Sequence, residues 1–343
     1  MMINEDLVTA SAKISSFLPN TPILLDYHLT KRLGRPTYLK LENLQATGSF
    51  KVRGALNCMA NLSPEHLSQG VVTCSSGNHG RAVATVAHML GVAATVCVPV
   101  WVDPVKLSAI KDKGAEIIVK GETYDETEKI SLELATERGL TYVHPFDDIK
   151  VIAGQGTVAL EVLSQLPQIG DIVVPLSGGG LAGGIAFAMR THSPETKVIA
   201  VSAEKASVML ASIKKGRPTQ LKEEPTIASA LSGGIDLANR HTFKLIQQQI
   251  DQHLTVNEDM IKNAMRYALN DLHMVVEGGG AVGLAALLSG SLKASDSSLP
   301  IVVVVSGGNV ASDQLTELYA LTKQTRKSRA NMPEPRKMTG KTR

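Results

Sequence analysis

Short, continuous apolar runs rich in β-branched residues recur along this chain and alternate with longer segments of helical character. The runs cover residues 71–74, 94–98, 116–119, 171–176, 198–201 and 301–305. Unbroken apolar runs indicate strands that are buried on both faces, as in parallel sheets. The segments between them predict helices over residues 80–90, 104–113, 124–138, 156–165, 258–272 and 281–288. This alternation predicts an α/β fold whose parallel sheet is covered by helices on both faces.

Three of the predicted strands run directly into glycine-rich turns. These turns are Ser75-Ser76-Gly77-Asn78-His79-Gly80, Ser177-Gly178-Gly179-Gly180-Leu181 and Ser306-Gly307-Gly308-Asn309. Backbone N–H groups at such turns, and at the start of a following helix, have no internal partner and bind anions readily. In parallel sheets the turns lie at the carboxyl ends of the strands, where ligands bind. Together they predict a site for a phosphate or a carboxylate.

Two common nucleotide sites do not fit these turns. None has the G-x-x-x-x-G-K-[ST] form of a nucleoside triphosphate loop, and the turn that begins at Ser177 lacks a well-placed acidic residue to complete a dinucleotide site. A nicotinamide-dependent enzyme is therefore the weaker interpretation.

Lys51 is the candidate reactive group. Gly48 and Ser49 before it predict a turn and a helix cap, and Phe50 offers an aromatic face to a flat ring. Desolvation beside that ring would lower the pKa of the Lys51 amine, which is how enzymes activate a lysine as a nucleophile. Arg53 is interpreted as a structural partner for an acid.

These residues together resemble the fold-type II pyridoxal-phosphate enzymes, in the branch of threonine dehydratase and serine racemase. The resemblance runs from about Thr21 to Ser289 and resumes at Ser306. It implies a tryptophan synthase β-like fold of two open, twisted, mostly parallel sheets with helices on both faces. It also implies a large cofactor-binding domain of residues 1–69 and 148–322 and a small, mobile substrate domain of residues 70–147.

The resemblance assigns the cofactor, pyridoxal 5'-phosphate, to named residues. Lys51 would hold it as a Schiff base, with Phe50 beside it. Asn78 would hydrogen-bond the ring hydroxyl, and Ser306 would face the pyridine nitrogen. The phosphate would be held by the backbone of four residues, with a further contact from the Ser177 hydroxyl; the four are Gly178, Gly179, Gly180 and Leu181.

The same resemblance implies the reaction. The loop that would bind the substrate carboxylate comprises Ser75, Ser76, Gly77, Asn78 and His79. Lys51 would remove the α-proton, and loss of the β-hydroxyl would then lead to a 2-oxo acid and ammonia. Because the Ser306 hydroxyl, unlike an Asp, does not keep the ring protonated, the cofactor is a weaker electron sink and early loss of the β-group is favoured.

Other functions stay open beside this dehydratase or ammonia-lyase. Ser76 occupies the position that serves racemases as the acid on the opposite ring face. The alternative is that Ser76 binds the substrate carboxylate and has no other role. β-Replacement is disfavoured, since cysteine-synthesising relatives have a Gly-Thr-Gly-Gly-Thr phosphate loop. A non-catalytic binder that kept the fold is a further alternative. His79 could merely cap the helix it begins, and Glu277 could be a turn residue or lie near the cofactor.

The sequence departs from the family in four ways. Ser177 stands where four glycines are common, and Ala228-Ser229-Ala230 replaces the usual Ala-Asp-Gly step, which could shift substrate preference. Relatives often bind a divalent cation through a Glu and an Asp six residues later. Glu204 is present but Leu210 takes the second position, so no metal site is expected. No isoleucine-binding regulatory domain is expected after Asn309.

Four segments also resemble the dehydratase-like proteins of hydroxyectoine breakdown. They are residues 145–148, 152–156, 176–180 and 239–243. This resemblance predicts weak activity on threonine and a substrate derived from hydroxyectoine or related to 3-hydroxyaspartate.

Composition excludes several other classes of protein. Residues 323–343 carry eight Lys or Arg and one Glu, so this tail has a charge of +7 and the rest of the +3 chain a charge of −4. An acidic body argues against a nucleic-acid-binding core, and the tail, which lacks an apolar period, is expected to be disordered. The three cysteines form no CxxC pair, and no apolar stretch is long enough to span a membrane. We expect a cytoplasmic enzyme, a homodimer as in its relatives, that acts on a small amino acid.

Overall fold

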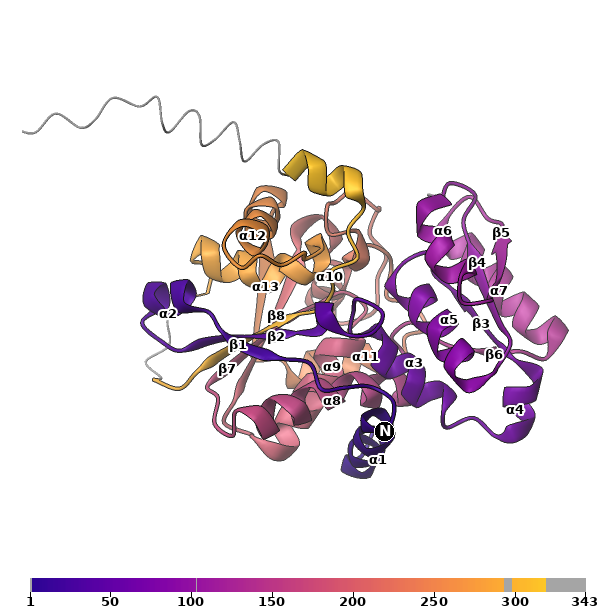
Figure 1. Cartoon of the computed structure of the whole chain (residues 1–343), viewed down its shortest axis with the longest axis horizontal. Coiled ribbons are helices and arrows are strands. Elements are labelled where there is room, and N and C mark those ends of the chain that lie inside the picture. Colours follow the sequence, from indigo (N-terminus) through magenta and orange to yellow (C-terminus); the bar gives the residue numbers. More distant parts are fainter. Residues whose placement is uncertain (1, 103, 293–297, 319–343) are drawn as a thin grey trace, which may run out of the picture.

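The computed structural model describes residues 2–102, 104–292 and 298–318. The strands form two separate sheets, one of six strands and one of four. In Figure 1 the four-stranded sheet and its helices form a unit at the right, and the six-stranded sheet lies in a larger unit at the left. The predicted α/β class with two mostly parallel sheets is confirmed.

The six-stranded sheet takes its strands from both ends of the chain. Their order is β1 (Ile23–Leu25), β2 (Thr37–Leu41), β10 (Ile301–Val305), β7 (Asp171–Pro175), β8 (Lys197–Ala203) and β9 (Gln252–Val256). All neighbours are parallel except β1, which is antiparallel to β2. The carboxyl ends of β2, β10 and β7 therefore lie side by side at one edge of the sheet.

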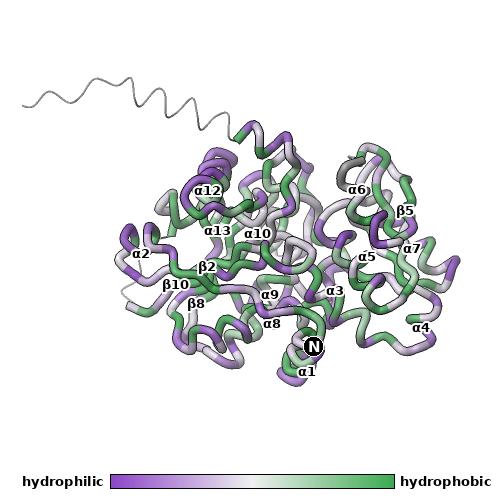
Figure 2. The backbone as a smooth tube through the Cα atoms, in the orientation of Figure 1, coloured by the Kyte–Doolittle hydropathy of each residue, from purple (hydrophilic) through white to green (hydrophobic). Residues whose placement is uncertain are grey.

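Strand β10 shows why both faces of this sheet are covered. Ile301, Val303 and Val305 pack in one core with α12 (Glu258–Asn270) and α13 (Gly278–Ser289). Val302 and Val304 pack on the opposite face, in the core that includes α8 (Ile149–Gln165), α9 (Gly180–His192) and α11 (Thr242–Gln249). Figure 2 shows the hydrophobic colouring of β2 and β10 inside the larger unit. An unbroken apolar run is thus what a strand between two helix layers requires.

The four-stranded sheet is wholly parallel. Its order is β5 (Glu116–Val119), β4 (Ala94–Val98), β3 (Val71–Cys74) and β6 (Thr141–Tyr142), and its helices are α4 (Pro64–Gln69), α5 (Asn78–Leu90), α6 (Pro104–Lys111) and α7 (Tyr124–Arg138). Its strands all fall inside the range 70–147. The domain limits and the mobility of this unit stay predictions.

Helix α3 (Lys51–Met59) lies between the two units (Figure 1). Val52, Leu56 and Met59 are buried in a core that also contains side chains of α5 in the small unit and Val151 of α8 in the large one. Both units therefore hold the helix that begins with Lys51.

The remaining elements lie around these sheets. They are α1 (Asn4–Ser15), α2 (Tyr27–Leu33), η1 (Glu42–Leu44), η2 (Glu204–Ala206), α10 (Val208–Lys215) and η3 (Ser229–Leu231).

The six strands and six helices predicted from the sequence are all present. The largest difference is the helix predicted over 156–165, which begins at Ile149 as α8. Strands β1, β2, β6 and β9 were not predicted. The basic tail of residues 323–343 lies outside the described residues. Within the described part of the chain, no helix has the length and apolar character needed to cross a membrane.

Candidate active site

Lys51 is the first residue of α3, and its amine is partly buried. The amine Nζ donates a hydrogen bond of 2.7 Å to the Pro145 carbonyl oxygen and lies 5.2 Å from the centroid of the Phe50 ring. Burial lowers the pKa of the Lys51 amine to about 8, against the opposing effect of the Glu277 carboxylate. An amine with this pKa is partly neutral near neutral pH, so it can act as a nucleophile and as a base.

The turn before Lys51 is joined to the end of β10. The Phe50 N–H donates to the Ser306 carbonyl oxygen at 3.1 Å, and Ser49 pairs with Gly307 in an isolated antiparallel bridge. Ser306 is 4% exposed. These contacts place Ser306 and Lys51 next to each other although 255 positions separate them in the chain.

The predicted turn at Gly48 is confirmed, but the predicted helix cap at Ser49 is wrong. Gly48 has a φ of 75°. The N-cap position of α3 is Phe50, and no side chain caps this helix. Because Ser49 is held in the bridge to Gly307, its hydroxyl is buried and has no hydrogen-bond partner among the described residues.

The glycine loop after β7 leads into α9. Gly179, the N-cap residue, has a φ of 90°, which favours glycine. A Cβ on Gly178 would lie 2.5 Å from ring atoms of Phe146, so a side chain does not fit there. The Ser177 hydroxyl, predicted to contact phosphate, donates to the Leu231 carbonyl oxygen at 2.8 Å. The N–H groups in the first turn of α9, those of Gly180 and Leu181 among them, have no acceptor within the helix and form an anion site.

Residues 144–146 connect Lys51 with this glycine loop. The Pro145 carbonyl accepts from Lys51, and the next residue, Phe146, packs against Gly178. His144 Nδ1 accepts hydrogen bonds from the backbone N–H groups of Phe146 at 3.1 Å and Asp147 at 2.8 Å. Burial lowers the pKa of His144 to about 4, so its ring is neutral near neutral pH.

Asn78 begins α5 and faces residues from the large unit. Its Nδ2 donates to Glu277 Oε1 at 2.6 Å, and its Oδ1 accepts from Asn309 Nδ2 at 2.7 Å. Arg81 donates to Asn309 Oδ1 at 2.9 Å. Glu277 is 8% exposed and its charge acts on the Lys51 amine. Asn78 therefore lies near Lys51, and its side chain joins the two units.

The other residues of the predicted substrate loop differ in exposure. Ser75 and Ser76 are both partly exposed, and the Ser75 hydroxyl accepts from the N–H of the exposed Gly77 at 3.2 Å. His79 is 3% exposed, and its Nε2 lies 2.9 Å from the Val143 carbonyl oxygen. The interpretation of His79 as a helix cap is wrong, because no side chain caps α5. Burial lowers the pKa of His79 to about 3.

Sequence reasoning missed Arg81 and His144, which the structure brings to Asn309 and to the segment beside Lys51. Of the two alternatives left open for Glu277, a place near Lys51 and Asn78 is the one that the structure favours, and Asn309 of the third glycine turn bonds to Asn78. Their contacts cross between segments far apart in the chain. The one local signal was that Glu277 precedes Gly278 and Asn309 ends a glycine turn.

The residues present fit pyridoxal 5'-phosphate. A primary amine of lowered pKa lies beside an aromatic ring, and the open N-terminus of α9 offers N–H groups to a phosphate. Ser306 is 4% exposed and its carbonyl is bonded to Phe50, next to Lys51, so its hydroxyl is placed where it could face a ring nitrogen. In the described part of the chain no group of three His, Cys, Asp or Glu converges, and Glu204 is exposed.

Comparisons with known proteins agree with this site. Residues 14–307 match the family described as pyridoxal-phosphate dependent enzyme. The chain is 36% identical over 329 residues to L-threonine ammonia-lyase of Thermotoga maritima, covering 95% of this chain and 81% of the relative. It is 40% identical over 306 residues to a putative threonine dehydratase of Sinorhizobium fredii, covering 89% and 92%. Maize serine racemase superposes with a TM-score of 0.87 at 33% identity, covering 96% of this chain and 99% of that one.

These similarities confirm the predicted cofactor and the predicted enzyme class, a pyridoxal-phosphate-dependent lyase. They also confirm the fold type expected from the motif around Lys51. The chain therefore belongs to the pyridoxal-phosphate dependent enzymes, in the fold-type II branch of the threonine dehydratases and serine racemases.

Proposed function

We propose that the protein eliminates water from a small hydroxy amino acid and releases a 2-oxo acid and ammonia. The observation that carries this proposal is the Lys51 amine, which has a pKa near 8 and lies within a set of groups suited to a phosphate-bearing ring. Glu277 and Pro145 surround the amine, and Ser306 adjoins the turn before it. Threonine and serine are the first substrates to consider, because the relatives include an L-threonine ammonia-lyase.

The residues would divide the work as follows. Pyridoxal 5'-phosphate, when bound, supplies an electron sink for the bond that breaks at the α-carbon. Lys51 would hold the cofactor through its amine, and the same amine would serve as the base that accepts the α-proton of the substrate. The N–H groups at the start of α9 would hold the phosphate, and the Ser306 hydroxyl would face the ring nitrogen without supplying a full positive charge. Residues 145–146 would line the site between Lys51 and the glycine loop, because Pro145 bonds to the amine and Phe146 packs against Gly178.

The loop at Ser75, Ser76 and Gly77 would bind the substrate carboxylate. It precedes the N-terminus of α5, whose first N–H groups and dipole favour an anion. Asn78, fixed by Glu277 and Asn309, would orient the ring hydroxyl of the cofactor.

The segment at Ser229 and Ala230 is a candidate for substrate preference. The carbonyl of the next residue, Leu231, accepts the hydroxyl proton of Ser177 in the glycine loop, so this segment adjoins the phosphate end of the site. Its difference from the usual Ala-Asp-Gly step supports a substrate other than free threonine. A 3-hydroxyaspartate-like or hydroxyectoine-derived amino acid is the finer proposal.

Racemisation is the second candidate function. Ser76 is partly exposed on the loop that precedes α5. A hydroxyl in that position could return a proton to the opposite face of the α-carbon. The similarity to maize serine racemase supports this alternative.

The test combines a spectrum with a product assay. The absorbance of purified protein near the edge of the visible range would be measured before and after reduction with borohydride. Ammonia release would then be measured with L- and D-serine, L-threonine, 3-hydroxyaspartate and the products of hydroxyectoine hydrolysis. We expect a reducible absorbance that is lost in Lys51→Ala and ammonia from one class of substrate. Absorbance without ammonia, together with interconversion of serine enantiomers, would favour the racemase. Absence of reducible absorbance would refute the proposal.

We further propose that the protein is a homodimer in which residues 70–147 close over the substrate. The support is the resemblance to relatives and the side-chain bridge from Asn78 and Arg81 to Asn309. Light scattering during size-exclusion chromatography tests the dimer, and a monomer mass would contradict it.

A further inference from the structure

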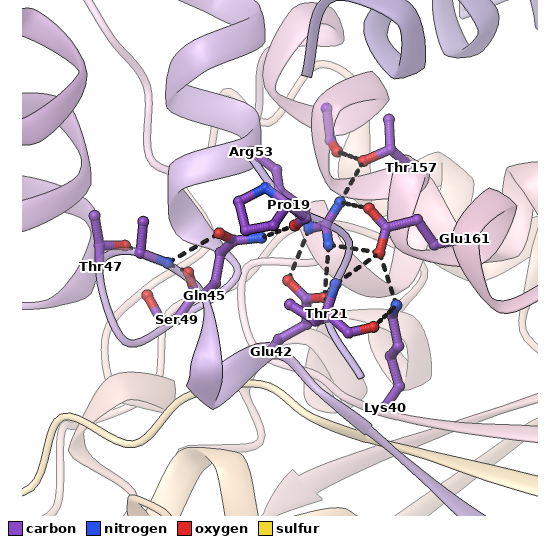
Figure 3. Close-up of polar contacts among 12 residues, drawn as sticks. Pro19, Thr21, Lys40, Glu42, Gln45, Thr47, Ser49, Arg53, Thr157 and Glu161 are labelled. Carbon is purple, nitrogen blue, oxygen red and sulfur yellow. Dashed lines mark hydrogen bonds and ion pairs between the residues drawn. The ribbon is translucent and has the colours of Figure 1, made fainter. Parts of the chain in front are cut away.

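Four charged side chains lie buried together behind the first turn of α3. They are Lys40 from β2, Glu42 from η1, Arg53 from α3 and Glu161 from α8, and we call them the buried charge cluster. Lys40, Glu42 and Arg53 are 0% exposed, and Glu161 is 9% exposed. Figure 3 shows the Arg53 guanidinium between the two carboxylates. Two positive and two negative charges make the cluster neutral when all four side chains are ionised.

Every N–H of Arg53 in this cluster has an acceptor. Nε and Nη2 donate to Glu42 at 2.7 and 2.8 Å. Nη1 and Nη2 donate to Glu161 at 2.5 and 2.9 Å, and Nη1 also donates to the Thr157 hydroxyl at 3.3 Å. A guanidinium has five N–H donors in a fixed plane, so this set of bonds allows one orientation of the side chain.

Lys40 completes the cluster from the sheet. Its amine donates to Glu161 at 2.7 Å, to the Thr21 carbonyl at 2.9 Å and to Gln165 at 3.0 Å, which uses all three protons. Burying four charges is costly, and the attraction between them repays that cost only in part. Net stability is therefore a weak explanation for the cluster, whereas a fixed geometry follows directly from it.

The fixed orientation of Arg53 matters for the site because Arg53 lies two residues after Lys51 in the same helical turn. Two residues along an α-helix, the side-chain direction has rotated by about 200° about the helix axis, so the two side chains project to nearly opposite sides. Arg53 accordingly points to η1 and α8, while Lys51 points to the Pro145 carbonyl oxygen. The same turn of backbone thus carries the cluster on one side and the reactive amine on the other.

Packing of Val52 in the core shared with α5 and α8 also holds the start of α3, but packing alone leaves its polar groups without directed bonds. No side chain caps the helix, and the hydroxyl of Ser49, the natural candidate, is buried without a partner among the described residues. The Phe50 N–H bond to Ser306 fixes one point before the helix. Among the side chains of the first turn, Arg53 makes the largest set of directional bonds, and these five bonds restrict the rotation of the turn in addition to that packing.

We propose that Arg53, held between Glu42 and Glu161, is a positioning residue for Lys51. It fixes the first turn of α3 so that the Lys51 amine stays enclosed beside the Pro145 carbonyl and Phe50. The proposal rests on the proposed function in one respect, namely that Lys51 holds the cofactor.

The test compares Arg53→Lys with Arg35→Lys. Arg35 also makes a buried ion pair, to Asp171 at 2.6 Å with both side chains 5% exposed, but Asp171 begins β7 and so lies at the end of the sheet away from the glycine loops. Both variants keep the positive charge and lose the planar fork. A merely structural role predicts that they behave alike.

In the holoenzyme we expect Arg53→Lys to lower kcat about tenfold or more with KM within about twofold, because small misplacement of a reacting group has large kinetic effects. Arg35→Lys should leave kcat and its pH profile unchanged while lowering the melting temperature to a similar degree. Equal melting temperatures with unchanged kcat and pH profile in Arg53→Lys would overturn the proposal.

A second measurement uses cofactor-free protein and needs no turnover. Competitive acetylation of Lys51, followed by mass spectrometry over a range of pH, reports the ionisation of its amine. A first turn that is released should expose the amine to water, so the pH midpoint should rise toward that of an ordinary lysine in Arg53→Lys and stay in place in Arg35→Lys. An unchanged midpoint in Arg53→Lys would also overturn the proposal.

Two further variants keep the test decisive. If Arg53→Lys does not fold, Glu42→Gln removes one charge from the fork at nearly constant shape and should give the same changes in kcat and midpoint, smaller in size; no change in either would overturn the proposal. Lys51→Ala separates the two hypotheses. If it retains cofactor and activity, the proposed function fails; if it loses both while Arg53→Lys behaves as wild type, only the positioning role fails.

Discussion

The two sides of the first turn of α3 treat their polar groups in opposite ways. In the buried charge cluster every N–H of Arg53 and Lys40 has a protein acceptor. On the Lys51 side the Ser49 hydroxyl and His79 Nδ1 have no hydrogen-bond partner among the described residues, and the first N–H groups of α9 are open.

The two sides of this one helical turn therefore serve different purposes: the buried charge cluster supports the fold, and the Lys51 side is suited to bind a ligand. A closed set of bonds has one arrangement and resists change, which suits a support. An open set leaves donors and acceptors for a ligand, which suits a site and costs stability until the ligand binds. Substitutions in the buried charge cluster should therefore lower the free energy of unfolding and, through the first turn of α3, also kcat, whereas substitutions on the Lys51 side should lower activity with little loss of stability.

Replacing Lys51 should give the largest loss of activity of the changes considered. It is also the clearest test of the contrast between the two sides of the first turn of α3. Lys51→Ala removes both the attachment point and the proposed base, so we expect kcat to fall about 10³-fold or more. Its melting temperature in the cofactor-free state should be equal or higher, because a desolvated amine is removed. Ammonia release and thermal unfolding measure the two effects, with exposed Lys111 replaced by Ala as the control. A strongly destabilised Lys51→Ala protein would show that the open side also supports the fold.

Breaking the closed side should give the largest loss of stability. Arg53→Met leaves the carboxylates of Glu42 and Glu161 buried without their shared partner, and removing one member of a buried pair costs about 3–5 kcal/mol. Urea unfolding of the two proteins measures the difference. Arg138→Met, at a half-exposed pair with Glu116, is the control and should cost about 1 kcal/mol or less. A similar small loss in both variants would remove the contrast between buried and exposed pairs.

The same contrast explains how much the sequence could predict. Strand β10 could be predicted from the sequence because all five residues from Ile301 to Val305 are apolar and β-branched. Strand β2 was missed because Lys40 interrupts its apolar pattern. Lys40 can be buried in β2 only because Glu161, 121 positions later, pairs with it. That compensation is a tertiary contact and has no local signal.

The site divides in the same manner. Lys51, the glycine loop and Ser306 were predicted, because each lies in a short segment whose residues are themselves unusual. The contact of Asn78 with Glu277 was not, since it joins two units over 199 positions. The acid partner expected for Arg53 exists, but the sequence could not show that there are two.

Acid should affect the open side before it affects the closed side. His144 has a folded-state pKa of about 4, below its ordinary value of 6.5, so between these pH values the unfolded chain binds more protons. Stability is therefore full above pH 6.5 and falls as the pH drops toward 4, by at most about 1.4 kcal/mol per pH unit for this residue. His144→Asn keeps an acceptor for the N–H groups of Phe146 and Asp147 and should flatten this dependence. Urea unfolding at a series of pH values is the measurement, and an unchanged slope would assign the acid sensitivity elsewhere, with His79 as the next candidate.

The smallest expected effect comes from replacing Thr157, which tests how much one bond contributes within the buried charge cluster. The Thr157 hydroxyl accepts from Arg53 at 3.3 Å, the longest of the five bonds to that guanidinium, and donates to the Gly154 carbonyl at 2.7 Å. Thr157→Val keeps the shape and leaves all four charges paired, so we expect a loss of about 1 kcal/mol and an unchanged kcat.

The exposed Thr136, whose hydroxyl donates to the Leu132 carbonyl at 3.1 Å, is the matched control, and its replacement by Val should change stability by less than about 0.5 kcal/mol. If Thr157→Val instead lowered kcat while the unfolding free energy stayed near that of the control, the loss of one weak bond would be enough to displace Lys51. The orientation of Arg53 would then be set by all five of its bonds together, and the two carboxylates alone would not suffice to fix the first turn of α3.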